Sequence, residues 1–258
     1  MAPGLFARFL SRLSVRDSGE PTSSNRASSF HLIWTVPPVP LDEISATFEL
    51  VTEPTVPRLY FWALQASFVD ATGSRGGAHL GLQWHPSYPG NRAVNWGGYG
   101  PSGELDGSSS ILSSTLGNVN TRDYPWATGV PYSFSIWSPE PGRWRGTVTN
   151  LATSEATVIR DLYSTGTHLA EPMVWTEAFC RCDDPPVTAR WSALAAIAAN
   201  AEIPVEGVRV NYQTLARGGC TNTTVRRDET GLLQITATKR DIPQGRVISI
   251  NQVPDTEY

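Results

Sequence analysis

The residues of this chain best suited to chemistry are histidines, glutamines and one carboxylate at alternating positions of extended-looking runs. His79, Gln83 and His85 fall on the same parity of the run 78–85, and Gln65 belongs to the polar set of the run 59–69. Side chains alternate across a β-strand, so each set shares one face. Glu177 stands alone among large apolar neighbours, and burial there would raise its pKa. We therefore expect a polar face with acid–base capability.

Aromatic residues and one arginine accompany these polar groups. Trp137, Trp175 and Trp96 lie in further candidate strands, and Arg145 follows Trp137 across a predicted hairpin. Neutral hydrogen-bonding side chains suit sugar hydroxyls, and the C–H face of a sugar ring packs on an aromatic ring. The sequence thus predicts a concave sheet face that binds a carbohydrate or another small ligand through Gln65, Gln83, Trp137, Trp175 and Trp96.

Two other functions remain open from the same residues. The first is an enzyme, with His79 or His85 and Glu177 as acid and base; His79 would meet Glu177 across neighbouring strands. It would be a polysaccharide lyase, in which Arg145 neutralises a uronate, or an intracellular hydrolase or isomerase of specialised metabolism. The second is a structural or partner-binding module. An enzyme predicts that His79, His85, Arg145 and Glu177 share one pocket; a lectin predicts an open groove with Trp137 exposed; a scaffold predicts scattered residues.

Composition excludes several classes of protein. Lysine plus arginine is 20 and aspartate plus glutamate is 24, a net charge of −4, whereas a general nucleic-acid binder needs a basic surface. Lys239 is the single lysine, and phosphate-loop, nucleophile-elbow and zinc-protease motifs are absent from the sequence. We expect no nucleic-acid partner, no cofactor and no bound metal.

Strand signals dominate from residue 30 onward. Short aromatic and β-branched runs are separated by turns drawn from 22 glycines and 20 prolines. Hairpins without intervening helices predict an all-β, concanavalin A-like or jelly-roll antiparallel sandwich. We expect a core sandwich over 30–186 and, over 187–258, closing strands or a small β-rich subdomain. The alanine-rich stretch 192–201 fits a helix and a strand extension equally well.

The beginning of the chain predicts a flexible leader over 1–29. Its first 16 residues combine apolar side chains with arginines spaced by four, a pattern typical of a short amphipathic helix that touches a membrane surface or a partner. No apolar run is long enough to span a membrane, and no secretory signal is recognisable, so we expect a cytoplasmic protein without excluding secretion. Cys180, Cys182 and Cys220 are then expected to be reduced thiols, with a Cys182–Cys220 disulfide as the alternative in an oxidising compartment.

Several short motifs resemble a bacterial family of unknown function, with actinobacterial members. They are LYFWALQ (59–65), GAHLGLQW (77–84), NWGGY (95–99), GRWRGTVT (142–149) and VWTEAF (174–179). The resemblance covers about residues 30–192 and implies a concanavalin A-like lectin/glucanase sandwich, whose curved face often binds or cleaves glycans in better-known relatives. The family supplies no catalytic residues to transfer.

Overall fold

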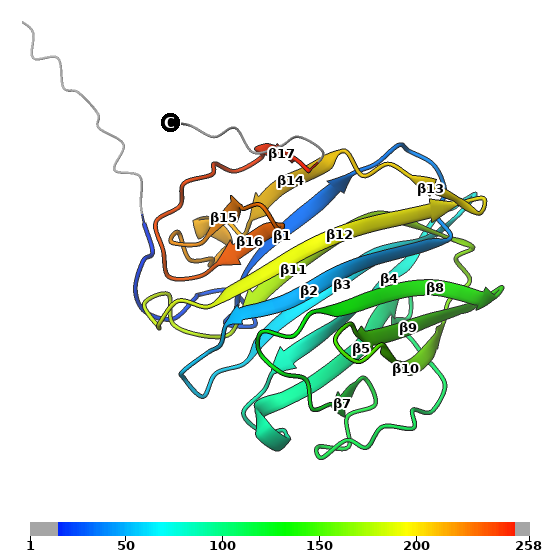
Figure 1. The fold of residues 1–258 in the computed structure, drawn as a ribbon, viewed down its shortest axis with the longest axis horizontal. Coiled ribbons are helices and arrows are strands. Elements are labelled where there is room, and N and C mark those ends of the chain that lie inside the picture. Colours follow the sequence, from blue (N-terminus) through cyan, green and yellow to red (C-terminus); the bar gives the residue numbers. More distant parts are fainter. Residues whose placement is uncertain (1–14, 251–258) are drawn as a thin grey trace, which may run out of the picture.

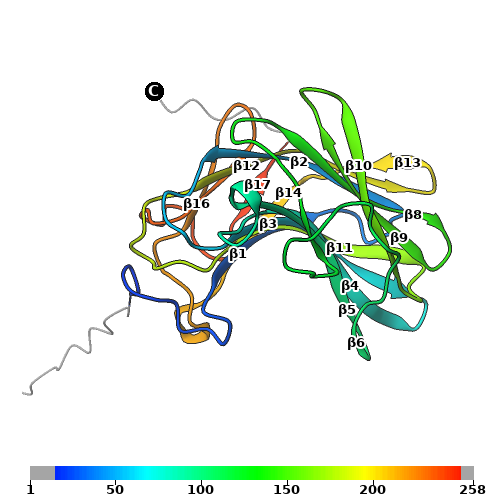
Figure 2. The same cartoon turned by 90° about the horizontal axis from the view of Figure 1, so that it is seen from below.

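A computed structural model describes residues 15–250, and it is a sandwich of two antiparallel sheets (Figures 1 and 2). Sheet A has the strand order β17-β14-β1-β11-β3-β4-β5-β6, with β7 paired to β5. Sheet B has the order β10-β9-β8-β2-β12-β16-β15, with β13 paired to β12. The predicted all-β sandwich is confirmed.

The strands of sheet A are β1 (Ser28–Thr35), β3 (Tyr60–Asp70), β4 (Gly73–Trp84), β5 (Arg92–Gly100), β6 (Gly103–Glu104), β7 (Thr121–Asp123), β11 (His168–Ala178), β14 (Gly207–Tyr212) and β17 (Val247–Ser249). Those of sheet B are β2 (Glu43–Thr52), β8 (Tyr132–Glu140), β9 (Arg143–Asn150), β10 (Glu155–Tyr163), β12 (Thr188–Ala198), β13 (Ala201–Ile203), β15 (Thr224–Arg227) and β16 (Leu232–Ile235). Two short 3-10 turns, Pro89–Asn91 and Leu215–Arg217, are the helical elements of the described chain.

The core lies between the sheets and follows the alternation of the sequence. In β3, the predicted core residues Tyr60, Trp62 and Leu64 have no exposed surface. Phe48 of sheet B packs on Trp62 of sheet A with ring centroids 5.5 Å apart. Burying several large aromatic side chains at about 25 cal/mol per Å² is the main stabilising contribution to such a sandwich. The second set of each strand is therefore free to face outward.

The segment after residue 187 supplies strands to both sheets. β12 pairs with β2 in sheet B, and β14 pairs with β1 in sheet A. The alanine-rich stretch is the end of β12 and not a helix, because pairing with β2 and burial outweigh the helix propensity of alanine. A bulge between Ser192 and Ala195 breaks its register. The division of the chain at residues 29 and 186 stays a prediction.

Residues 15–27 form a strap that is hydrogen-bonded to the sandwich, within the stretch 1–29 for which the sequence predicts a flexible leader. Thr22 N donates to Gly218 O over 3.0 Å, and Cys182 N donates to Gly19 O over 2.8 Å. Ala27 is fully buried, and β1 begins at the next residue. The amphipathic segment predicted over 1–16 lies almost wholly outside the described residues. None of the helices described over 15–250 is long and apolar enough to cross a membrane.

A disulfide lies beside this strap. Cys182 and Cys220 are bonded, whereas Cys180 is free and buried. The expectation of three reduced thiols is wrong, and the alternative pairing is the one found. Burial raises the pKa of the Cys180 thiol to about 11, so this thiol stays protonated at neutral pH.

Candidate functional site on the outer face of sheet A

The register of sheet A gathers several of the predicted site residues on its outer face. β11 lies between β1 and β3, so Trp175 pairs with His31 on one side and Ala63 on the other. Gln65 on β3 pairs with His79 on β4. All of these side chains point away from the core, because they alternate with buried core residues.

A hollow of about 350 Å³ lies among these residues, and we call it the aromatic hollow. Its lining residues are Ser29, His31, Phe61, Gln65, Gly77, Ala78, His79, Tyr99, Trp175 and Glu177. Trp175 Nε1 donates a hydrogen bond to Gln65 Oε1 over 2.9 Å, which fixes the indole and the amide relative to each other. The rings of Phe61 and Trp175 meet edge to face at 4.8 Å, and His79 lies 5.6 Å from Trp175.

A second, more polar hollow of about 670 Å³ adjoins the first, and we call it the polar hollow. Its lining residues are Ser23, Ser24, Asn25, Ser29, His31, Glu177, Asn211, Tyr212, Gln213, Thr214 and Arg217. Ser29, His31 and Glu177 belong to both hollows. The strap therefore forms one wall of the site, and these three residues mark the junction between its two parts.

Burial shifts the pKa values of His31, His79 and Glu177 toward the neutral form of each side chain. Burial lowers the pKa of His79 to about 4, although a hydrogen bond to the Asn95 side chain opposes this shift. Burial also lowers the pKa of His31. It raises the pKa of Glu177, partly opposed by a hydrogen bond of 2.9 Å from Asn25 Nδ2 to Glu177 Oε1. Both histidines are thus uncharged at neutral pH, and Glu177 holds its proton to a higher pH than an ordinary glutamate.

The histidine nearest to Glu177 in the register is His31, and not His79 as the sequence predicted. β3 separates β4 from β11, and the register places His79 two strands and four residues away from Glu177, a Cα separation on the order of 15 Å. The predicted pairing of these two residues across neighbouring strands is therefore wrong. His31 is diagonal to Glu177 on adjacent strands, a position from which long side chains reach each other.

Five of the predicted residues lie elsewhere, and the first four are Gln83, His85, Trp96 and Trp137. Gln83 is buried on β4, and His85 lies just beyond the end of β4, where its ring contacts Tyr88 at 4.8 Å; neither lines the two hollows. Trp96 is fully buried in the core, because its parity on β5 matches that of Val94. Trp137 is on β8 of sheet B, on the opposite side of the sandwich from Trp175.

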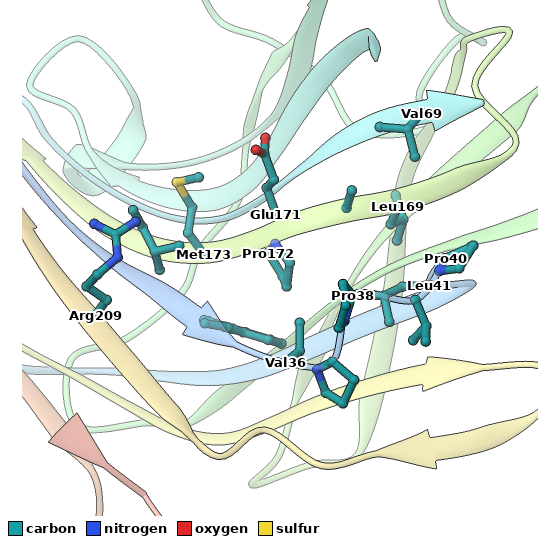
Figure 3. A pocket seen from close by; sticks show the side chains of 15 residues that line it. Val36, Pro38, Pro40, Leu41, Val69, Leu169, Glu171, Pro172, Met173 and Arg209 are labelled. Atoms are coloured by element: carbon teal, nitrogen blue, oxygen red, sulfur yellow. The ribbon is translucent and has the colours of Figure 1, made fainter. Parts of the chain in front are cut away.

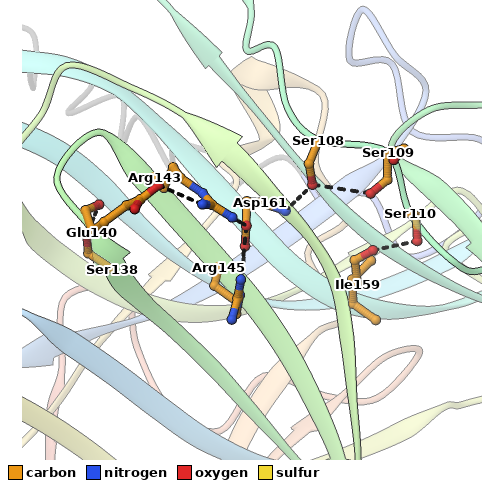
Figure 4. A network of polar contacts seen from close by, with 9 residues as sticks. All are labelled: Ser108, Ser109, Ser110, Ser138, Glu140, Arg143, Arg145, Ile159 and Asp161. Atoms are coloured by element: carbon orange, nitrogen blue, oxygen red, sulfur yellow. Dashed lines mark hydrogen bonds and ion pairs between the residues drawn. The ribbon is translucent and has the colours of Figure 1, made fainter.

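Arg145 also belongs to sheet B, where it is part of an ion-pair network (Figure 4). Its Nε lies 2.8 Å from Asp161 Oδ1, and Arg143 contacts the same carboxylate. The Arg145 guanidinium lies over the ring of Trp137 at 5.5 Å. Hydrogen bonds from Arg145 and Arg143 lower the pKa of Asp161. The expected convergence of His79, His85, Arg145 and Glu177 in one pocket is not found.

Several residues of the site escaped the sequence analysis, among them His31, Asn211 and Tyr99. His31 and Asn211 lie on β1 and β14, and Tyr99 lies on β5, where 66% of its surface is exposed. In the stretch 28–35, alternation puts His31 on the face of the strand that does not contain Phe30 and Leu32. This pattern could have identified His31 as a residue of the outer face. Nothing in the sequence shows that β14, far along the chain, lies beside β1.

A third hollow of about 610 Å³ lies near the end of β1 and the start of β11 (Figure 3). Prolines 37, 38, 40 and 172 and several aliphatic side chains line it, and its charged lining residues are Glu171 and Arg209. It contains none of the predicted site residues. Over residues 15–250, no group of three or more histidine, cysteine, aspartate or glutamate side chains is arranged to hold a metal ion.

No protein-family model and no curated protein sequence matches this chain. Among solved structures, scytalido-glutamic peptidase with a transition-state analogue has 10% identity and a TM-score of 0.45, over 85% of this chain and 98% of the peptidase. SCP-B, a member of the eqolisin peptidases, has 9% identity and a TM-score of 0.42 over 85% and 98% of the two chains. Alginate lyase PA1167 from Pseudomonas aeruginosa has 12% identity and a TM-score of 0.24 over 67% and 65%.

These likenesses are too distant to transfer an activity to this chain. The two-sheet antiparallel sandwich agrees with the architecture that the family resemblance implied. Membership of that bacterial family stays a prediction.

Proposed function

We propose that this protein binds an uncharged carbohydrate on the outer face of sheet A. The observation that carries the proposal is the placement of Gln65, His79 and Trp175 around one hollow, where β11 lies beside the β3–β4 hairpin although it is distant in the sequence. A purely structural sheet face does not need neutral hydrogen-bonding side chains at these positions, because charged side chains would keep the exposed face hydrated equally well.

The chemistry of the hollow supports a neutral polar ligand. His31 and His79 carry no charge at neutral pH, and Glu177 is the single carboxylate among the residues that line the two hollows. Amide and imidazole groups exchange hydrogen bonds with hydroxyls, and the exposed ring of Tyr99 offers a surface on which a sugar ring packs. Among the described residues, the aromatic hollow has no arginine or lysine in its lining to neutralise a polyanionic uronate, and Arg145 is paired with Asp161 on the other sheet.

The test is a calorimetric titration with cello-, laminari- and malto-oligosaccharides of two to six units, with neutral peptides of similar length as comparison ligands. Binding of at least one sugar series is expected, and Tyr99→Ala and Gln65→Ala should weaken it by about tenfold or more. Trp137→Ala on sheet B should leave it unchanged. Binding of peptides alone, or loss of sugar binding in Trp137→Ala only, would overturn the proposal.

A second candidate function is proton-transfer catalysis at the same face, favoured by the diagonal pair of His31 and Glu177. Burial lowers the pKa of the His31 imidazole and raises the pKa of the Glu177 carboxyl, which are the directions that suit a general base and a general acid. Two-carboxylate hydrolysis finds no second carboxylate among the lining residues. If the protein is an enzyme, the wild type should turn over a bound sugar. Glu177→Gln and His31→Gln should each abolish this turnover and retain sugar binding. Binding without turnover would leave the carbohydrate-binding function alone.

The disulfide bears on where this function is exercised. Disulfides persist mainly in oxidising compartments, so the Cys182–Cys220 bond favours an extracellular or periplasmic setting over the cytoplasm expected from the sequence. The state of the three cysteines in protein isolated from its native source, read by mass spectrometry after thiol alkylation, tests this point.

A further inference from the structure

The two hollows of sheet A form one continuous path across the strands. They meet at Ser29, His31 and Glu177, and their outer limits are Asn211 on β14 and Tyr99 on β5. Five inter-strand steps separate β14 from β5 in the order β14-β1-β11-β3-β4-β5. At about 4.8 Å per step, the path spans about 24 Å in the direction across the strands. A single sugar ring fills only a small part of such a length.

The two ends of this path differ in chemistry. The aromatic hollow has Phe61, Trp175 and the exposed Tyr99 in its lining, which suit the apolar face of a ring. The polar hollow is lined mainly by serine, threonine, asparagine and glutamine side chains. Such a surface meets hydroxyl groups with hydrogen bonds and offers little to pack against a ring. Adjacent units of one ligand would therefore be held in different ways.

The polar hollow also has free hydrogen-bonding capacity. Asn211 Oδ1 accepts a hydrogen bond of 2.7 Å from Gln244, while its amide nitrogen has no partner among the described residues. The Arg217 guanidinium likewise donates no hydrogen bond to any residue between 15 and 250, and Arg217 is exposed. A ligand that reaches this end of the path would find donors not already committed to the protein.

The strap holds the polar hollow open before any ligand arrives. Thr22 is tied to Gly218 by a backbone hydrogen bond of 3.0 Å, and Asn25 is tied to Glu177 at 2.9 Å. The disulfide joins Cys182, whose amide holds Gly19 of the strap, to Cys220 beside Gly218. A preformed wall costs less ordering entropy on binding than a loop that must close.

We propose that the polar hollow is a second subsite, and that the ligand is a linear, uncharged oligosaccharide lying across the strands from β5 to β14. One part of the chain packs in the aromatic hollow, the next part hydrogen-bonds in the polar hollow, and the linkage between them passes over Glu177 and His31. This inference rests on the proposed carbohydrate-binding function and adds the length and direction of the ligand.

The test is calorimetric affinity as a function of chain length, with the sugar series that binds in the screen above. The hexasaccharide is expected to bind about tenfold more tightly than the disaccharide, as extra hydrogen bonds of ordinary strength would provide. Asn211→Ala and Arg217→Ala should each weaken the hexasaccharide by about fivefold and leave the disaccharide unchanged. Arg209→Ala is the matched control, because Arg209 lies on the same strand as Asn211 and lines neither hollow.

The outcomes separate the two proposals. If disaccharide and hexasaccharide bind equally, or if Asn211→Ala and Arg217→Ala change nothing, the second subsite is overturned and carbohydrate binding stands. If Arg209→Ala weakens the hexasaccharide as much as Asn211→Ala does, the ligand follows a different path and the inference fails. If no sugar of any length binds, both proposals fail together.

Discussion

The outer faces of the two sheets contain similar residue types but use them in opposite ways. On sheet B, Arg145 and Arg143 enclose Asp161, and the carboxylate side chain is 4% exposed (Figure 4). On sheet A, Glu177 has a single amide partner within residues 15–250, Asn25, and it lines two hollows. Paired charges stabilise a fold and leave little for a ligand, whereas neutral groups beside a hollow remain free to bind one. Partners, more than residue types, distinguish the structural face from the candidate functional face.

The largest expected effect tests how far the sheet A face depends on its disulfide. The Cys182–Cys220 bond spans a sequence separation of 38 residues, so the double variant Cys182→Ser, Cys220→Ser should lose about 4 kcal/mol of unfolding free energy in the chain-entropy description. Urea unfolding monitored by tryptophan fluorescence measures this loss. Cys180→Ala, which removes the free thiol, is the matched control and should cost much less. Equal losses in both variants would show that the disulfide does not anchor this region.

A second test removes the carboxylate of the sheet B network. Asp161→Asn should lower the unfolding free energy by about 2 kcal/mol, because two arginines lose a charged acceptor that is almost fully buried. The lowered pKa of Asp161 also predicts the direction of a pH effect. Its contribution to the unfolding free energy is present above the ordinary pKa of an aspartate and is lost as the pH falls through the pKa of the folded state. Denaturation at several pH values should show a weaker acid dependence in the variant. An unchanged stability would mean that sheet B is not held by this network.

The third test concerns His79 on sheet A. Its folded pKa of about 4 lies below the ordinary 6.5, so the unfolded chain binds the extra proton first as the pH falls. Wild-type stability should therefore decrease between pH 6.5 and about 4, and His79→Gln should remove that part of the decrease. His168→Gln is the control at a side chain that is 42% exposed. A pH dependence identical in wild type and His79→Gln would contradict the burial of this imidazole.

The smallest expected effect is the stability change in Glu177→Gln, and its direction is opposite to that expected for Asp161→Asn. Glu177 has a raised pKa, so its contribution to stability is greatest below the ordinary pKa and declines as the pH rises through the folded value. Glu177→Gln should thus leave stability at pH 7 unchanged or raise it by less than about 1 kcal/mol, opposite to Asp161→Asn. Glu140→Gln, at an exposed side chain of sheet B, is the matched control. A clear loss of stability in Glu177→Gln would make Glu177 a structural residue.

Local alternation was enough to predict which residues share a face. Tyr60, Trp62 and Leu64 are in the core as expected, and Gln65 and Trp175 face outward together. A period of two is a local property, and it survives folding wherever one face of a strand is buried. Trp96 could have been assigned to the core by the same rule, since it shares its parity with the buried Val94.

Strand order and register could not be predicted in the same way. Nothing between residues 59 and 85 indicates that β11 lies beside β3, or that β3 separates His79 from Glu177. Trp137 and Arg145 have the side-chain chemistry of site residues, but β8, which carries Trp137, pairs with β2 in sheet B, and β9, which carries Arg145, pairs with β8. Such pairings join segments far apart in the chain, and they depend on the global packing of two sheets rather than on any short motif.

The central claim is that a carbohydrate binds sheet A and not sheet B. It is tested most directly by following the indole N–H signals of ¹⁵N-tryptophan-labelled protein by NMR during titration with the tightest-binding oligosaccharide. The signal of Trp175, whose Nε1 is bonded to Gln65 in the aromatic hollow, should move, and that of Trp137 should remain in place. Movement of the Trp137 signal with no change at Trp175 would contradict the account.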